Sequence, residues 1–160
     1  MRYIGIFLVL LAALIFSREY SRYMRKRLRE CEGFLSFISY MKIQVGCFMR
    51  PLRELASGFS SKPLSEIGFI ASLEKSDGIY EAYKEVEPRL SLSQNEKEVL
   101  EVLFSSIGDC YLEEGMKMID SAYVRAEALY SSLSKECPKN IKLVSALSVT
   151  LALGFFILII

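Results

Sequence analysis

The charged and apolar residues of this chain are strongly segregated along the sequence. Tyr3 to Phe16 and Leu143 to Ile160 contain no charged residue, and Arg2 is the one charged residue outside the segment between them. As a helix, the 18 residues of the C-terminal run would span about 27 Å, close to the ~30 Å hydrocarbon core of a bilayer. The N-terminal run is shorter, with 14 residues. We therefore expect a transmembrane helix at each end.

The N-terminal run also has the length of a signal-peptide core, and its flanks distinguish the two interpretations. Ile15-Phe16-Ser17 is a poor cleavage site. Basic residues follow this run and precede the second one, and this membrane-flanking set comprises Arg18, Arg22, Arg25, Lys26, Arg27, Arg29, Lys139 and Lys142. Basic residues near membrane ends stay on the cytoplasmic side. We therefore favour an uncleaved anchor over a removed signal, and a cytoplasmic central segment with both termini outside over the opposite topology.

The central segment shows helical spacing and no sustained strand-like alternation. After the first anchor, apolar residues recur at steps of four and three until Lys42 interrupts them: Met24, Leu28, Cys31, Leu35 and Ile38. A longer seam precedes the second anchor: Leu112, Met116, Ile119, Tyr123, Ala126, Tyr130 and Leu133. Three heptads are the lower limit for a coiled coil, so we favour packing within a bundle over that alternative. We predict two long helices that pack together and bring the anchors side by side, with Pro138 ending or kinking the second.

Short helices are predicted between the two long ones. Pro51 and Pro63 can each begin a helix, the second extending through Leu73. Another is expected over residues 79–86, and Ser93 with Glu96 forms an S-x-x-E capping box ahead of a longer helix. The chain is thus predicted to be all-α. An N-terminal anchor (residues 1–17) precedes a cytoplasmic bundle of about six helices (residues 18–142), and a C-terminal transmembrane helix (residues 143–160) follows.

The sequence lacks the residue combinations of common catalytic and metal sites. It contains no histidine, phosphate-binding loop, dinucleotide fingerprint or nucleophile elbow. Its carboxylate-rich stretches are better explained as solvated helix faces. Four cysteines without a C-x-x-C pair are expected to be free thiols rather than zinc ligands: Cys31, Cys47, Cys110 and Cys137. We therefore expect no enzymatic activity, no cofactor and no metal.

Two groups of residues are candidates for interaction. The basic flank is best interpreted as a topology signal, with attraction to anionic headgroups and nucleic-acid binding as alternatives. The segment from Cys31 to Lys142 has 13 basic and 17 acidic residues, a net charge of −4, which disfavours nucleic acid and favours a basic protein partner. Tyr80, Tyr83 and Tyr111 form a candidate partner surface, although a structural role in the core is the preferred interpretation.

Several short motifs resemble a known family in their order. A proline-led helix begins at Arg50-Pro51-Leu52, and a second motif runs from Leu92-Ser93 to Ile107-Gly108. The last four residues are Ile157-Leu158-Ile159-Ile160. With a basic helix behind an N-terminal anchor, this order resembles stage III sporulation protein AB of endospore-forming bacteria over nearly the whole chain. Departures from the family pattern occur at Tyr111, Gly115 and Ser148.

The resemblance implies a membrane subunit of a channel between mother cell and forespore. It implies a helical domain similar to the platform proteins of type II secretion and type IV pilus systems. The implied partners are a secretion-type cytoplasmic ATPase and other channel membrane proteins, with docking on residues 51–89; homo-oligomer formation is left open. An adaptor that recruits a soluble regulatory protein is the alternative. A transporter is disfavoured because neither anchor contains an intramembrane charge.

Overall fold

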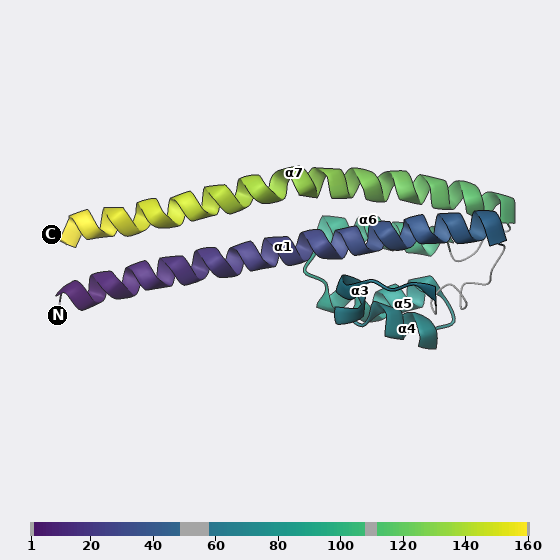
Figure 1. Ribbon diagram of the computed structural model, residues 1–160, viewed down its shortest axis with the longest axis horizontal. Helices are drawn as coiled ribbons and strands as arrows, with labels where there is room; N and C mark the ends of the chain where they lie inside the picture. Colours follow the sequence, from purple (N-terminus) through teal and green to yellow (C-terminus); the bar gives the residue numbers. More distant parts are fainter. Residues whose placement is uncertain (1, 49–57, 108–111, 160) are drawn as a thin grey trace. The chain divides into compact units, whose positions relative to one another are not determined.

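The computed structural model describes the backbone of residues 2–48, 58–107 and 112–159 (Figure 1). Side chains are described for residues 8–44, 58–106, 116–151, 153 and 154. These parts of the chain contain only helices: α1 (Arg2–Phe48), α3 (Lys62–Glu66), α4 (Phe69–Lys75), α5 (Ile79–Val86), the 3-10 helix η1 (Glu87–Arg89), α6 (Gln94–Ile107) and α7 (Leu112–Ile159). The predicted all-α class is confirmed.

The chain divides into two compact units. Unit 1 combines Met1–Lys26 with Leu133–Ile160, and unit 2 comprises Arg27–Ser132. Both long helices, α1 and α7, contribute to both units. The two ends of the chain therefore pack together in unit 1, as the matching apolar seams predict.

Unit 1 has a narrow interior and an apolar exterior. Met24, Leu133 and Cys137 are buried in it, and the Cys137 thiol donates to the Met24 carbonyl at 3.4 Å. Large apolar side chains are exposed on both helices: Leu8, Val9, Leu10, Leu11, Leu14, Ile15, Phe16, Leu143, Leu147, Val149, Leu151 and Leu153. Within the described residues, none of the helices combines the length and the apolarity that a membrane crossing requires. The terminal transmembrane helices remain a prediction.

Aromatic rings form the core of unit 2. The Phe34 ring of α1 lies 5.3 Å from Phe69 of α4, 5.7 Å from Phe104 of α6 and 6.1 Å from Tyr83 of α5, between ring centroids. Phe37 extends the cluster along α1. These separations suit edge-to-face packing, which adds to the stabilisation from burial. Figure 1 shows α3, α4 and α5 gathered beside the second half of α1.

The face of α1 that meets these rings differs from the predicted seam. Met24, Cys31 and Ile38 are buried as expected, whereas Leu28 and Leu35 are only half-buried. Phe34, Phe37 and Met41, which lie beside the seam, are fully buried. In unit 2, α1 contacts neighbours on more than one side, so a single stripe with a period of 3.5 residues does not describe its buried surface.

Gly33 lies where α1 contacts Leu64 of α3. A Cβ atom at this position would come within 3.0 Å of Leu64 Cγ. Leu64 is fully buried, so its side chain has little room to move. The absence of a side chain at Gly33 therefore allows the two helices to make this contact.

The short helices follow the predicted breaks, with one exception. Helix α5 spans Ile79–Val86, as expected. The single helix predicted from Pro63 to Leu73 is wrong, because the chain turns at Gly68, which has φ 85° and ψ 9° between α3 and α4. The helix predicted to begin at Pro51 lies mostly outside the described residues.

The residues of the predicted α7 seam differ in burial. Ile119, Ala126 and Leu133 are buried, Tyr123 and Tyr130 are half-buried, Met116 is exposed, and the Leu112 side chain lies outside the described residues. Lys42 of α1, the residue that interrupts the first seam, forms a 2.9 Å ion pair with Asp120 and lies 5.2 Å above the Tyr123 ring. Antiparallel packing of the two long helices in unit 2 therefore explains the seam. Pro138 lies inside α7 and does not end it. Proline removes one backbone N–H donor, and the buried Leu133 and Cys137 pack the turns just before it.

Replacing Gly68 with alanine is expected to lower the free energy of unfolding by about 1–2 kcal/mol, since a Cβ atom is strained in the left-handed region. Thermal unfolding of the full chain, followed by circular dichroism, measures the change. Gly78→Ala is the matched control, because Gly78 has φ −151° and its Cβ would meet only the flexible end of Glu81. Equal destabilisation by the two variants would contradict a requirement for positive φ at Gly68.

Candidate functional site

A polar clamp fixes the start of α6 to α1. Arg27 Nε donates to Glu96 Oε2 at 2.8 Å, and Arg27 Nη2 donates to Glu96 Oε1, so the contact has two parallel hydrogen bonds. The side chains of Arg27 and Glu96 are 18% and 8% exposed. Arg27 therefore belongs to a largely buried ion pair, in contrast with the prediction that it is a membrane-flanking charge.

Glu96 also caps the helix that it belongs to. Its Oε2 accepts a hydrogen bond of 2.8 Å from the Ser93 backbone N–H, as the predicted capping box requires. Burial acts to raise the pKa of Glu96, but the hydrogen bonds from Arg27 and Ser93 outweigh it and hold the pKa below its usual value. The carboxylate thus stays charged near neutral pH while it is nearly enclosed.

Glu30 holds the segment just before α6. This glutamate lies one turn after Arg27 on α1 and is 1% exposed. Its Oε2 accepts a hydrogen bond of 2.7 Å from the Ser91 backbone N–H. Buried carboxylates are rare and costly unless they are hydrogen-bonded, so Glu30 indicates a structural role that the sequence did not reveal. Arg27 and Glu30 together, the α1 clamp, fix residues 91–96.

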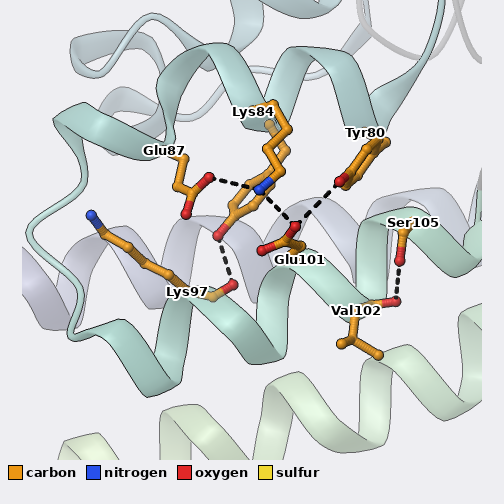
Figure 2. Close-up of polar contacts among 8 residues, drawn as sticks. Tyr80, Lys84, Glu87, Lys97, Glu101, Val102 and Ser105 are labelled. Atoms are coloured by element: carbon orange, nitrogen blue, oxygen red, sulfur yellow. Dashed lines mark hydrogen bonds and ion pairs between the residues drawn. The ribbon is translucent and has the colours of Figure 1, made fainter.

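A second polar group joins α5 to α6 (Figure 2). Lys84 Nζ lies 2.6 Å from Glu101 Oε1 and 3.1 Å from Glu87 Oε2, and the Tyr80 hydroxyl donates to Glu101 Oε1 at 3.2 Å. The hydrogen bonds to Glu101 and Glu87 raise the pKa of Lys84, and the bond from Lys84 lowers the pKa of Glu101. The four side chains form a partly exposed network that fixes the position of α5.

The candidate partner surface formed by three tyrosines is not supported as a unit. Tyr83 is fully buried, and its hydroxyl donates to the Lys97 carbonyl at 2.8 Å. It therefore has a structural role in the core, which was the preferred interpretation, and is not available for a contact surface. Burial also raises the pKa of this hydroxyl. Tyr80 is half-buried in the α5–α6 network, and Tyr111 lies outside the described residues. The spacing of Tyr83 on α5 could not show that it faces the aromatic core.

Charged side chains cover the outside of the short helices. Residues 58–89 contain four basic and six acidic residues, a net charge of −2. Five of the acidic residues are exposed: Glu66, Glu74, Asp77, Glu81 and Glu85. We call the exposed side of α3, α4 and α5 the distal surface. Three basic residues of the same segment are also exposed, so the exposed charge is mixed with an acidic excess: Lys62, Lys75 and Arg89.

Family comparison gives this arrangement a biological setting. The family model described as "Stage III sporulation protein AB (spore_III_AB)" matches residues 2–160 of the chain. The chain belongs to this family. Its role is therefore in stage III of sporulation. No curated protein and no solved structure matches the chain.

Apart from Arg27, the predicted membrane-flanking basic residues take no part in the α1 clamp. They are exposed on α1 and α7: Arg18, Arg22, Arg25, Lys26, Arg29, Lys139 and Lys142. Arg22 forms an exposed ion pair with Glu19, three residues earlier. An exposed pair of this kind contributes little to stability.

The thiols and carboxylates that the structure describes do not assemble a ligand set, and Cys47 and Cys110 lie outside the described side chains. Cys31 and Cys137 are buried free cysteines, and burial, with a contribution from Glu96, raises the pKa of Cys31 to about 12. Cys31 is therefore a neutral thiol at physiological pH. Across the residues searched, no group of three or more potential metal-ligating side chains occurs.

Glu96→Gln is expected to lower the free energy of unfolding by about 2 kcal/mol or more, because a charge-assisted contact to partly buried Arg27 is lost. Since the folded-state pKa of Glu96 is depressed, its stabilisation is complete above the unfolded pKa of about 4.3 and is lost as pH falls through the folded pKa. Thermal unfolding between about pH 7 and pH 3 tests both effects.

Glu98→Gln is the matched control, because Glu98 is exposed on the same helix. It should unfold like the wild-type chain at neutral pH and keep the full acid-dependent loss of stability. The Glu96→Gln variant should show a smaller acid-dependent loss, the remainder coming from groups such as Glu30. Identical pH profiles for the two variants would refute the assignment.

Proposed function

We propose that this protein is a non-enzymatic platform subunit of a sporulation channel between mother cell and forespore. In this proposal, unit 1 holds the chain in the membrane, and the distal surface of unit 2 docks a secretion-type cytoplasmic ATPase. The observation that carries it is the division of the surface: large apolar side chains cover unit 1, and charged side chains cover α3, α4 and α5.

The exposed apolar side chains of unit 1 support attachment to a membrane. Leu8 to Leu11 are four successive exposed residues, so they point to all sides of α1. Leu143, Leu147 and Leu151 continue the apolar exterior on α7. A helix that is apolar all round and not covered by protein is suited to a lipid environment. The exposed basic residues that follow the first apolar segment and precede the second favour a cytoplasmic position for unit 2.

The distal surface supports docking because it combines charge with a fixed backbone. The α1 clamp and the α5–α6 network hold α5 and α6 in place, so Glu81 and Glu85 are presented on a supported helix. Docking of a basic patch would then require little ordering of the platform, which reduces the entropic cost of binding. Energy for transport would come from the ATPase, since the sequence offers no combination of groups for nucleotide hydrolysis.

Membrane attachment is tested by introducing one arginine into each apolar segment, as Leu11→Arg with Leu151→Arg. An arginine near the middle of a transmembrane helix costs about 2.5–3.5 kcal/mol on insertion scales, so the double variant should be lost from carbonate-washed membranes. Val124→Arg is the control, because Val124 of unit 2 is 62% exposed, matching the 63% of Leu151. Wild-type chain in the soluble fraction would rule out the membrane role.

Docking is tested by charge reversal on α5. The double variant Glu81→Lys and Glu85→Lys should reduce co-purification of the ATPase with the full-length chain from sporulating cells by about tenfold or more, because attraction becomes repulsion. Glu127→Lys, an exposed reversal on α7, should retain the ATPase. Unchanged recovery with the α5 variant would contradict docking at the distal surface. Recovery of a soluble regulatory protein without an ATPase would favour the adaptor.

A further inference from the structure

Unit 1 contains an apolar pocket of about 140 Å³ between α1 and α7. Four residues of each helix line it, among them Leu10, Leu14 and Ser17 of α1 and Ser145, Val149 and Leu153 of α7. The leucine and valine side chains of this lining are exposed, so the pocket opens onto the apolar exterior of the unit. Another lining residue, Ser148, donates its hydroxyl to the Val144 carbonyl of its own helix at 2.8 Å.

The lining changes in polarity along each helix. On α1, Ser17 is the lining residue nearest to the basic stretch that begins at Arg18. On α7, Ser145 is the lining residue nearest to the basic stretch that ends at Lys142. Hydroxyl groups therefore lie on the side of the pocket that adjoins the charges, and leucine side chains lie on the other side.

Two basic residues continue the helix faces that line the pocket. Arg18 follows Leu14 by four residues, and Lys142 precedes Ser145 by three, so each is a surface neighbour of a lining residue. Both basic residues are exposed, and neither takes part in an ion pair within the part of the chain that the structure describes. Their charges are therefore available to a ligand at the serine end of the pocket.

The polar part of unit 1 carries a strong positive excess. Residues 17–26 and 133–142 contain seven basic and two acidic residues, a net charge of +5, whereas unit 2 has 12 basic and 17 acidic residues, a net charge of −5. The hydrogen bond from the Cys137 thiol to the Met24 carbonyl joins these two stretches. Their positive charges are therefore gathered in one region, next to the pocket.

We propose that unit 1 binds an anionic phospholipid, with an acyl chain in the pocket and the phosphate headgroup at Arg18 and Lys142. This inference rests on the proposed attachment of unit 1 to a membrane. The ligand must combine an apolar body with negative charge at one end, because the pocket is apolar and the residues at its serine end are basic. An apolar cavity of about 150 Å³ accommodates benzene, so this pocket takes a segment of about six carbon atoms.

Other ligands match less of this surface. A soluble phosphate or a nucleic acid would contact the basic residues but leave the pocket and the surrounding apolar side chains in water, which is unfavourable. A helix of another protein, about 10–12 Å in diameter, is too wide to enter the pocket. An anionic lipid fits the pocket and the charges together, since basic residues at a membrane surface attract anionic headgroups.

Lipid binding to the purified full-length chain tests the headgroup contact. Native mass spectrometry in neutral detergent counts the lipids retained when phosphatidylglycerol or phosphatidylcholine with the same acyl chains is added. The wild-type chain should bind phosphatidylglycerol about tenfold or more tightly than phosphatidylcholine, and R18Q with K142Q should remove most of that preference. K117Q with R125Q is the matched control, because it removes two exposed charges of α7 in unit 2 and should bind both lipids like the wild type.

Filling the pocket tests the acyl-chain contact. S145L should weaken the binding of both lipids by about tenfold or more, because the leucine displaces at least two methylene groups at about 0.8 kcal/mol each. A146L is the matched control, since Ala146 is exposed and does not line the pocket. It should bind both lipids like the wild type.

Three results would overturn the proposal: equal wild-type affinity for the two lipids, unchanged phosphatidylglycerol binding by R18Q with K142Q, or unchanged lipid binding by S145L. A second polypeptide that is bound in place of lipid and released by S145L would assign the pocket to a protein contact instead. A wild-type chain that stays in carbonate-washed membranes but binds no phosphatidylglycerol refutes this inference alone. Absence of the wild-type chain from those membranes refutes the proposed function.

Discussion

The contact between Arg27 and Glu96 joins residues 69 positions apart and holds the start of α6 against α1. A partly buried ion pair is stabilising only when its geometry compensates for lost hydration. Here the two parallel hydrogen bonds, together with the capping bond from Ser93, provide that compensation. Glu30 holds Ser91 from the same face of α1, so the segment before α6 has little freedom. Once α6 is placed, its inner face completes the aromatic core.

This placement supports the distal surface of unit 2, which rests on the Phe34 cluster and is held laterally by Lys84 and Glu101. Helices α1 and α7 each contribute residues to this unit and to the apolar unit 1. The proposed lipid site lies in unit 1 and shares no residue with the distal surface, so each can be altered without changing the other.

Several features of the fold could be predicted because they depend on local chemistry. The limits of α5 follow from Gly78 before it and Pro88 after it, and the start of α6 follows from the Ser93–Glu96 capping box. Other features depend on neighbours that are distant in sequence. The burial of Tyr83, for example, depends on Phe34 of α1 and Phe104 of α6. In the sequence, Arg27 cannot be told from the other membrane-flanking charges, and only the fold shows that it pairs with Glu96. Likewise, only the fold shows that Gly33 lies against Leu64.

The sequence by itself determined the all-helical class, the segregation of apolar ends from a charged centre, the family and the pairing of the two long helices. These properties arise from periodicity, capping and composition, which act over a few turns of helix. The tertiary structure decided which charges are buried, which tyrosines are structural and where apolar surface stays uncovered. Those outcomes depend on contacts between residues far apart in the chain, such as Glu30 with Ser91 and Lys42 with Asp120. No local pattern specifies such contacts, because each is formed only when the helices pack.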